Sequence, residues 1–170
     1  MATILTTTYD TDAALAVTAW TTTLLAGETA TSAIFDNTSS LYVDVLIGGA
    51  LALDATTPVA GNTMDIYISG QYSETATDMG GAIDALYGAA GEEVVDTSFV
   101  RANLTLLAVV SVEATTPATA QTYHWGPVSV ASAFGGVMPK RFMLALHNNT
   151  AGAIASGCDV NTTGIKYTST

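Results

Sequence analysis

Basic residues are scarce in this chain of 170 residues, and the first of them is Arg101. Four Lys and Arg stand against 15 Asp and Glu, so the net charge is −11 at pH 7. Proteins that bind nucleic acid place positive side chains along the phosphate backbone. Because residues 1–100 carry acids and no base, we expect no nucleic-acid partner.

Cysteine and histidine are nearly as rare. The single Cys158 cannot form a disulfide within the chain, and a lone thiol of this kind predicts an inert packed residue in a reducing cytoplasm. His124 and His147 are the only histidines, too few for a structural zinc site. The sequence also lacks a Gly-x-Ser-x-Gly elbow and a phosphate-binding loop. We therefore expect no enzymatic activity, no metal at these residues and no cofactor.

Long apolar runs and a basic amino-terminal start are missing as well. Thr, Asp and Gly interrupt every apolar run before it reaches the roughly 18 residues needed to cross a bilayer. A secretory signal begins with basic residues, and none precedes Arg101. These absences predict a protein that neither spans a membrane nor is exported by a secretory signal.

Short runs with alternating hydrophobic residues predict β-strands. In each run the alternate positions are hydrophobic, which fits a strand with one buried face. The runs are Leu41, Val43, Val45 and Ile47 against Tyr42 and Asp44; Met64, Ile66 and Ile68 against Asp65, Tyr67 and Ser69; and Phe142, Leu144 and Leu146 against Met143, Ala145 and His147. Hydrophobic residues make up 49% of the chain, enough for a core in a single domain.

The turn-forming and polar residues between these runs predict how the chain is divided into strands and loops. Residues 1–30 are rich in threonine and weakly periodic, and we expect an amino-terminal arm or loosely attached strands there, followed by one domain over residues 31–170. Gly48-Gly49 predicts a bulge or a bend between two strand halves. Strands are expected at 32–35, 41–53, 63–71, 104–113, 122–125, 128–131, 141–148 and 160–167. About eight strands without intervening helices predict an all-β, jelly-roll-like antiparallel sandwich.

A glycine-rich acidic segment over residues 73–97 predicts a long surface loop. Its carboxylates could supply oxygen ligands to a hard cation such as Ca²⁺, although their spacing does not match an EF-hand. A solvated acidic loop is the alternative. The candidate cation ligands are Asp78, Asp84, Glu92, Glu93 and Asp96.

Several aromatic residues leave a carbohydrate-binding function open. Aromatic rings in loops and on strand faces can stack on sugars, although most aromatics in strands belong to cores or interfaces. The residues concerned are Tyr67, Tyr72, Tyr87, Tyr123 and Trp125.

Three segments together resemble a family of small virion proteins of tailed bacteriophages. Residues 37–45 form a polar turn that leads into an alternating strand, residues 58–68 form a loop followed by an Asp-x-Tyr strand, and residues 139–150 form a strand that ends in an Asn-rich turn. The acidic loop and the threonine-rich arm depart from the family pattern. The resemblance implies a noncatalytic, jelly-roll-like decoration or cement protein.

Such a protein would be made in the host cytoplasm and bind the major capsid protein on the virion surface. It would also bind itself, as a dimer or trimer. The candidate partner-binding residues are Trp20 in the arm, Arg101, Lys140 and Arg141. A carbohydrate-binding sandwich, or a tail or baseplate component used in host attachment, is the alternative.

Overall fold

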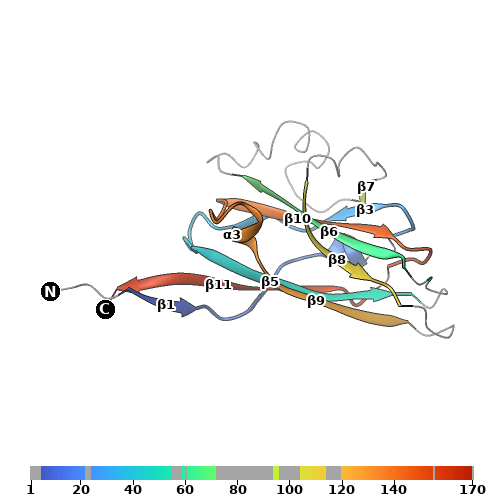
Figure 1. Ribbon diagram of the computed structural model, residues 1–170, viewed down its shortest axis with the longest axis horizontal. Coiled ribbons are helices and arrows are strands. Elements are labelled where there is room, and N and C mark those ends of the chain that lie inside the picture. The colour runs from blue at the N-terminus through green and yellow to red at the C-terminus, as the bar shows by residue number, and fades with distance from the viewer. Residues whose placement is uncertain are drawn as a thin grey trace.

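The chain forms a sandwich of two antiparallel β-sheets (Figure 1). This computed structural model describes residues 5–21, 24–54, 59, 61–71, 94–95, 104–113, 120–154 and 156–169. Sheet A has the order β1 (Leu5–Tyr9), β11 (Asp159–Ser169), β5 (Asp44–Leu53) and β9 (Gln121–Ser129), and β2 (Ala13–Ala14) also pairs with β11. The sandwich predicted from the strand pattern is confirmed.

Sheet B packs against sheet A. Its order is β7 (Val94–Val95), β3 (Thr29–Thr31), β10 (Arg141–Asn149), β6 (Thr63–Gln71) and β8 (Thr105–Ser111), and β4 (Phe35–Asp36) also pairs with β10. Two single-turn helices, α1 (Thr18–Thr21) between β2 and β3 and α3 (Val130–Ala133) between β9 and β10, follow strands of sheet A and precede strands of sheet B along the chain. Neither these helices nor any other among the described residues is long and apolar enough to cross a membrane.

The strands pair in nested order from the two ends of the chain. Strand β1 pairs with β11, β3 with β10, β5 with β9, and β6 with β8. As a result β10 and β11, which come last in the sequence, each occupy a central position in a sheet.

The core lies between the two sheets. Burying one large apolar side chain contributes roughly 1.5–3 kcal/mol relative to leaving it exposed. The largest fully buried side chains are Trp20, Phe142, Leu24, Ile47, Leu51, Leu53, Met64, Ile66, Ile68, Leu144, Leu146 and Ile154.

Strand β6 follows the sequence pattern closely. It spans Thr63–Gln71, the predicted range, and buries Met64, Ile66 and Ile68 while the alternate positions stay half-buried. The predicted bulge at Gly48-Gly49 is also present, because the pairing of β5 with β9 shifts between Ile47 and Gly49. A Cβ on Gly49 would collide with the backbone carbonyl of Asp159, so only glycine permits this close approach of β11.

The start of β5 differs from the prediction. The strand begins at Asp44, and Leu41 and Val43 lie in the preceding turn, where Leu41 has a positive φ of 52°. Val45 and Ile47 are buried as predicted, whereas Leu41 is 73% exposed. The alternating pattern continues through the turn in the sequence, because hydrophobic spacing alone does not mark where a strand starts.

A bulge also corrects the predicted face of β8. The alternation of the sequence over 104–113 predicts one buried face with Leu104, Leu106, Ala108, Val110 and Val112, but Leu106 is exposed while Val110 and Val112 are buried. The pairing with β6 skips Leu107, so the alternation reverses on the two sides of that residue.

The structure also differs from the prediction at strands β9 and β10. The two short strands predicted around Gly126 are one strand, β9, and Ala131 belongs to helix α3 instead of a strand. In β10 both faces are buried, including Met143, Ala145 and His147. Methionine and alanine are buried as readily as their larger neighbours, so their alternation does not mark an exposed face.

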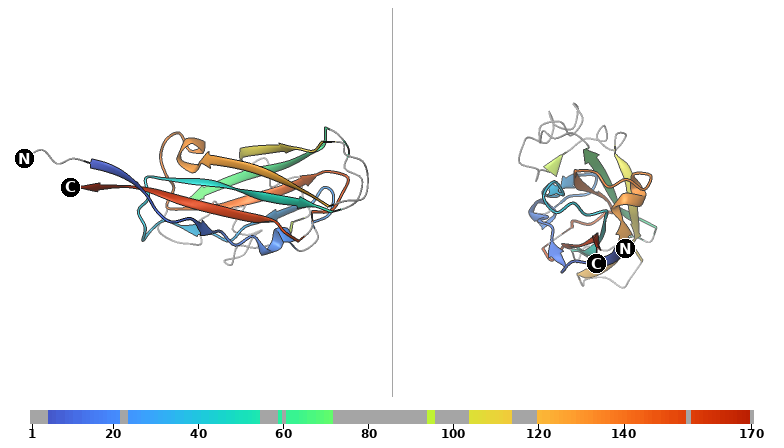
Figure 2. Two further views of the ribbon diagram at one scale, coloured as in Figure 1. Left: turned by 90° about the horizontal axis from the view of Figure 1, so that it is seen from below. Right: turned by 90° about the vertical axis from the view of Figure 1, so that its left-hand side faces the viewer.

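Most of the first thirty residues belong to the sandwich. Strand β2 pairs with β11, and Leu15, Val17, Trp20 and Leu24 are buried in the core. The expected boundary at residue 30 therefore does not separate an arm from a domain. Among the described residues before Thr31, β1 alone projects from the body of the sandwich, paired with the projecting end of β11 (Figure 2).

Candidate functional site

The paired ends of β1 and β11 extend beyond the other strands as a two-stranded ribbon (Figures 1 and 2). We define the ribbon as Leu5–Tyr9 together with residues 165–169. Strand β5 accompanies β11 only as far as the pair Asp44–Ile165, so the rest of the ribbon has no third strand among the described residues.

The two faces of the ribbon differ in chemistry. Partners in the register share a face, so Leu5, Tyr9, Ile165 and Tyr167 lie together on one side. Leu5, Tyr9 and Tyr167 are 65%, 66% and 58% exposed. The opposite face carries three threonines and Lys166. Contiguous exposed apolar residues of this kind usually mark an interaction surface.

A hydrogen-bonded cluster joins the ribbon to the body of the sandwich. The Tyr42 hydroxyl donates to Asp10 Oδ2 at 2.8 Å, and Lys166 Nζ donates to the same oxygen at 3.1 Å. The hydrogen bond from Tyr42, and next the one from Lys166, lower the pKa of the Asp10 carboxyl. Tyr42 also packs against Gly164, where the ring fills the space that a Cβ would take.

A hollow of about 590 Å³ lies beside this cluster. Its lining combines the turn before β5 with the start of β10: Asn37, Thr38, Leu41, Tyr42, Met138, Pro139, Lys140 and Arg141. We call this hollow and the ribbon together the ribbon end.

Hydrogen bonds fix the turn that forms one wall of the hollow. Asn37 Nδ2 donates to the Tyr42 carbonyl at 3.0 Å, and the Tyr42 N–H donates to Asn37 Oδ1 at 2.8 Å. Next to it, Arg141 Nε donates to Asp36 Oδ2 at 3.0 Å. Hydrogen bonds from the Thr38 hydroxyl and N–H are the main cause of a lowered pKa at Asp36. The wall is thus held in one conformation while the Leu41 side chain stays exposed.

The two lowered carboxyl pKa values predict an acid-dependent loss of stability. Both folded-state values lie below the ordinary 3.8, so the stabilising contribution is complete above pH 3.8 and disappears as the pH falls through the folded-state values. When the pH is lowered below 3.8, we expect the melting temperature to decrease less for the double variant Asp10→Asn, Asp36→Asn than for the wild type. Thermal unfolding followed by circular dichroism measures the two slopes, and equal slopes would contradict the assignment.

The residues that the sequence suggested as partner contacts lie in different places in the structure. Lys140 and Arg141 line the hollow at the ribbon end. Trp20 is wrong as a surface contact, because it is fully buried in the core of its own chain. Arg101 lies outside the described residues, as do the candidate cation ligands Asp78, Asp84, Glu92, Glu93 and Asp96.

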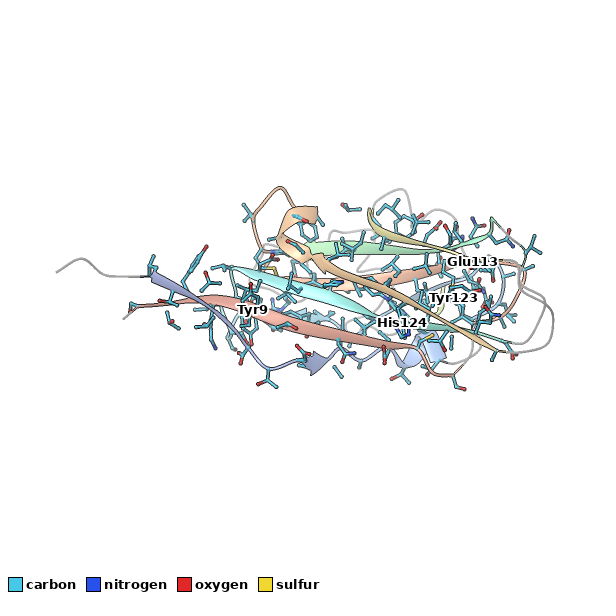
Figure 3. The ribbon with its side chains drawn as sticks, turned by 60° about the horizontal axis from the view of Figure 1, so that its bottom comes forward. Tyr9, Glu113, Tyr123 and His124 are labelled. Atoms are coloured by element: carbon cyan, nitrogen blue, oxygen red, sulfur yellow. The ribbon has the colours of Figure 1, made fainter. Side chains whose placement is uncertain are left out.

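A second hollow, of about 550 Å³, lies on the outer face of sheet A. His124, Asp159 and Asn161 rim it, and Gly48, Gly49 and Ala50 form part of its lining. Figure 3 shows His124 and Tyr123 toward the end of the sandwich away from Tyr9. No group of three potential metal-ligating residues occurs in the described part of the chain.

The other reactive side chains are buried. His147 Nδ1 lies 3.0 Å from Thr29 Oγ1, and both residues are inaccessible from outside. Cys158 accepts a hydrogen bond from the Ala52 N–H at 3.3 Å, and burial raises the pKa of its thiol. A buried protonated thiol is a poor nucleophile, in agreement with the packed role expected from the sequence.

The three described aromatic residues among those suggested for sugar stacking do not gather on one surface. Tyr67 lies on β6 in sheet B, whereas Tyr123 and Trp125 lie on β9 in sheet A and pack against the core. Tyr72 and Tyr87 fall outside the described ranges.

Comparison of the chain with known protein families, with curated proteins and with solved structures gives no match.

Proposed function

We propose that this protein is a noncatalytic decoration protein of a bacteriophage head, which binds the major capsid protein on the outside of the virion and stabilises the shell. The ribbon end carries the proposal. There, exposed apolar side chains lie beside the basic residues Lys140 and Arg141, at one end of a stiff sandwich. The nested strand pairing, which we interpret as a jelly roll, supports the same class of protein.

The chemistry of the ribbon end suits a protein partner. Three of the four basic residues, Lys140, Arg141 and Lys166, lie there, although the chain as a whole has a net charge of −11. Arg141 and Lys166 are paired with Asp36 and Asp10. An apolar centre with polar groups around it is the usual composition of a protein interface.

Stabilisation of a shell needs no catalytic group. A protein that binds the assembled shell but not free capsid subunits lowers the free energy of the assembled state by mass action. Many repeated sites make the total effect large even when each contact is modest. A rigid scaffold with one interaction surface, here the ribbon end, is sufficient for this role.

The proposal is tested by mixing the purified protein with candidate phage capsids that lack it and imaging the particles by electron cryomicroscopy. Regular density at fixed symmetry positions is expected, with the ribbon end facing the shell. If the protein remains free of every capsid offered, the proposal fails.

A double variant at the hollow tests which surface binds. Leu41→Asn removes an exposed apolar side chain at a positive φ that asparagine adopts readily, and Lys140→Glu reverses a charge. We expect capsid affinity to fall at least about tenfold, a loss of ~1.4 kcal/mol, with a folded β-sandwich still seen by circular dichroism. The matched control is Leu25→Asn, an exposed leucine at the other end of β10, which should bind as the wild type does.

A further inference from the structure

We propose that two copies of this chain associate through the free edge of β1, so that their ribbons join into one four-stranded antiparallel sheet. The order across the join would be β11, β1, β1 of the second copy and β11 of the second copy. The two sheets A would then be continuous through a two-fold axis at Thr7.

The hydrogen-bond pattern of the ribbon identifies the free groups. The Asp10 N–H donates to the Gly164 carbonyl at 2.8 Å, which places the even-numbered residues of this segment in the hydrogen-bonded pairs with β11. The N–H and C=O groups of Leu5, Thr7 and Tyr9 therefore point away from β11, toward the open edge. No described strand occupies that edge.

The sequence of β1 does nothing to block pairing at this edge. Natural edge strands are usually protected by charges, proline or bulges. Strand β1 has none of these, since its sequence is Leu-Thr-Thr-Thr-Tyr. The opposite edge of sheet A is β9, which contains Gly126 and Pro127 and whose pairing with β5 shifts register. Sheet A thus has one protected edge and one open edge.

The open edge is self-complementary. In an antiparallel pairing centred on Thr7, Leu5 lies opposite Tyr9 of the second copy, and Thr7 lies opposite its own equivalent. Leu5, Thr7 and Tyr9 are then all in hydrogen-bonded pairs, so the three free N–H groups of each copy find a carbonyl. The same pairing brings apolar side chains together on one face, and cross-strand apolar pairs stabilise a sheet.

Charge favours a second copy at this place over other places on the surface. Two chains with a net charge of −11 repel each other. The ribbon has a single charged side chain, Lys166, which is bonded to Asp10. Two copies can therefore approach through their ribbons without bringing like charges into contact.

The exposure of the ribbon gives a further reason for association. A two-stranded ribbon is marginally stable in water, and a third strand or a packing surface is normally required. The ribbon carries large exposed side chains at Leu5, Tyr9 and Tyr167. Edge pairing with a second copy supplies the missing strands and forms an isologous contact with closed symmetry.

Sedimentation velocity of the full chain, with no capsid present, tests the inference. We expect a dimer at micromolar concentration for the wild type and for Thr7→Val, which keeps the N–H group. Thr7→Pro removes the central free N–H without removing a bond to β11, and we expect it to weaken dimerisation at least about tenfold. Its melting temperature, extrapolated to low concentration, should equal that of Thr7→Val.

A second variant guards against a backbone effect of proline. Thr7→Glu leaves the backbone unchanged and puts two carboxylates opposite each other at the two-fold axis. It should be monomeric at low salt and recover dimerisation at high salt. A monomeric wild type, or Thr7→Pro and Thr7→Glu variants that dimerise as well as the wild type, would overturn the inference. Capsid binding is measured separately with the Leu41 and Lys140 variant, so either proposal can fail without the other.

Discussion

Replacement of Trp20 by alanine should lower the free energy of unfolding by about 4 kcal/mol, because it removes the largest fully buried side chain of the described residues. Trp20 is fully buried, and it lies on the short helix α1 between strands β2 and β3. Trp20 belongs to the core cluster between the two sheets, and hydrogen-bonded strands resist collapse into a cavity there. The cost then contains both the lost burial and most of the cavity term.

A conservative variant separates packing from hydrogen bonding at this position. Trp20 Nε1 is buried without an acceptor among the described residues, so the indole N–H contributes nothing favourable. Trp20→Phe keeps much of the volume and should cost far less than Trp20→Ala. Urea unfolding measures both, with Leu25→Ala, an exposed leucine outside the ribbon, as the control. A small effect of Trp20→Ala would contradict the placement of this segment in the core.

The second large effect is expected at Asn148, which we predict to lose about 3 kcal/mol of stability when it is replaced by alanine. Its side chain is fully buried at the end of β10. Asn148 Nδ2 donates to the Leu24 carbonyl at 2.9 Å and to the Gly152 carbonyl at 2.8 Å. Its Oδ1 accepts from the Thr150 N–H at 3.0 Å and from the Thr150 hydroxyl at 2.7 Å.

The cost follows from the groups that the substitution would leave behind. Alanine leaves the buried Thr150 N–H without its acceptor, and a buried polar group without a partner costs about 1–3 kcal/mol. It also removes one of two donors to each of the Leu24 and Gly152 carbonyls, which keep the Ile154 N–H and the Thr150 hydroxyl as partners. Asn149→Ala provides the matched control one residue away, because its side chain is exposed and makes one long hydrogen bond, of 3.4 Å, to Thr63. Urea midpoints of the two variants should differ clearly, and equal midpoints would refute the role of Asn148.

The central strands were predictable from sequence because the alternation of their apolar and polar residues matches the alternation of buried and more exposed positions. In strand β6 the apolar residues Met64, Ile66 and Ile68 alternate with Asp65, Tyr67 and Ser69, and the bounds of the strand follow from that alternation. The glycine pair in β5 likewise indicated the bulge. Where a strand has a bulge that no glycine marks, as at Leu107 in β8, the same pattern assigns the right face on one side of the bulge, with Val110 and Val112 buried, and the wrong face on the other, with Leu106 exposed.

The ribbon end was only partly predictable. Lys140 and Arg141 were singled out by their charge in an acidic chain, and both line the hollow. The ribbon itself depends on the pairing of Leu5–Tyr9 with residues 165–169, which are separated by most of the chain, and no local pattern encodes that register. Threonine-rich composition suggested an arm, but it could not distinguish the projecting β1 from the buried segment that contains Trp20.

The nested pairing also determines when the chain can fold during its synthesis. Strands β10 and β11 are made after all their partners, and each is inserted between two strands that were made earlier. Until residues 141–169 leave the ribosome, both sheets lack a central strand, and β3 and β5 each have an edge open to wrong pairing. Folding dominated by such distant contacts is slow. A nascent chain of this protein should therefore depend on protection from aggregation until its synthesis reaches β11.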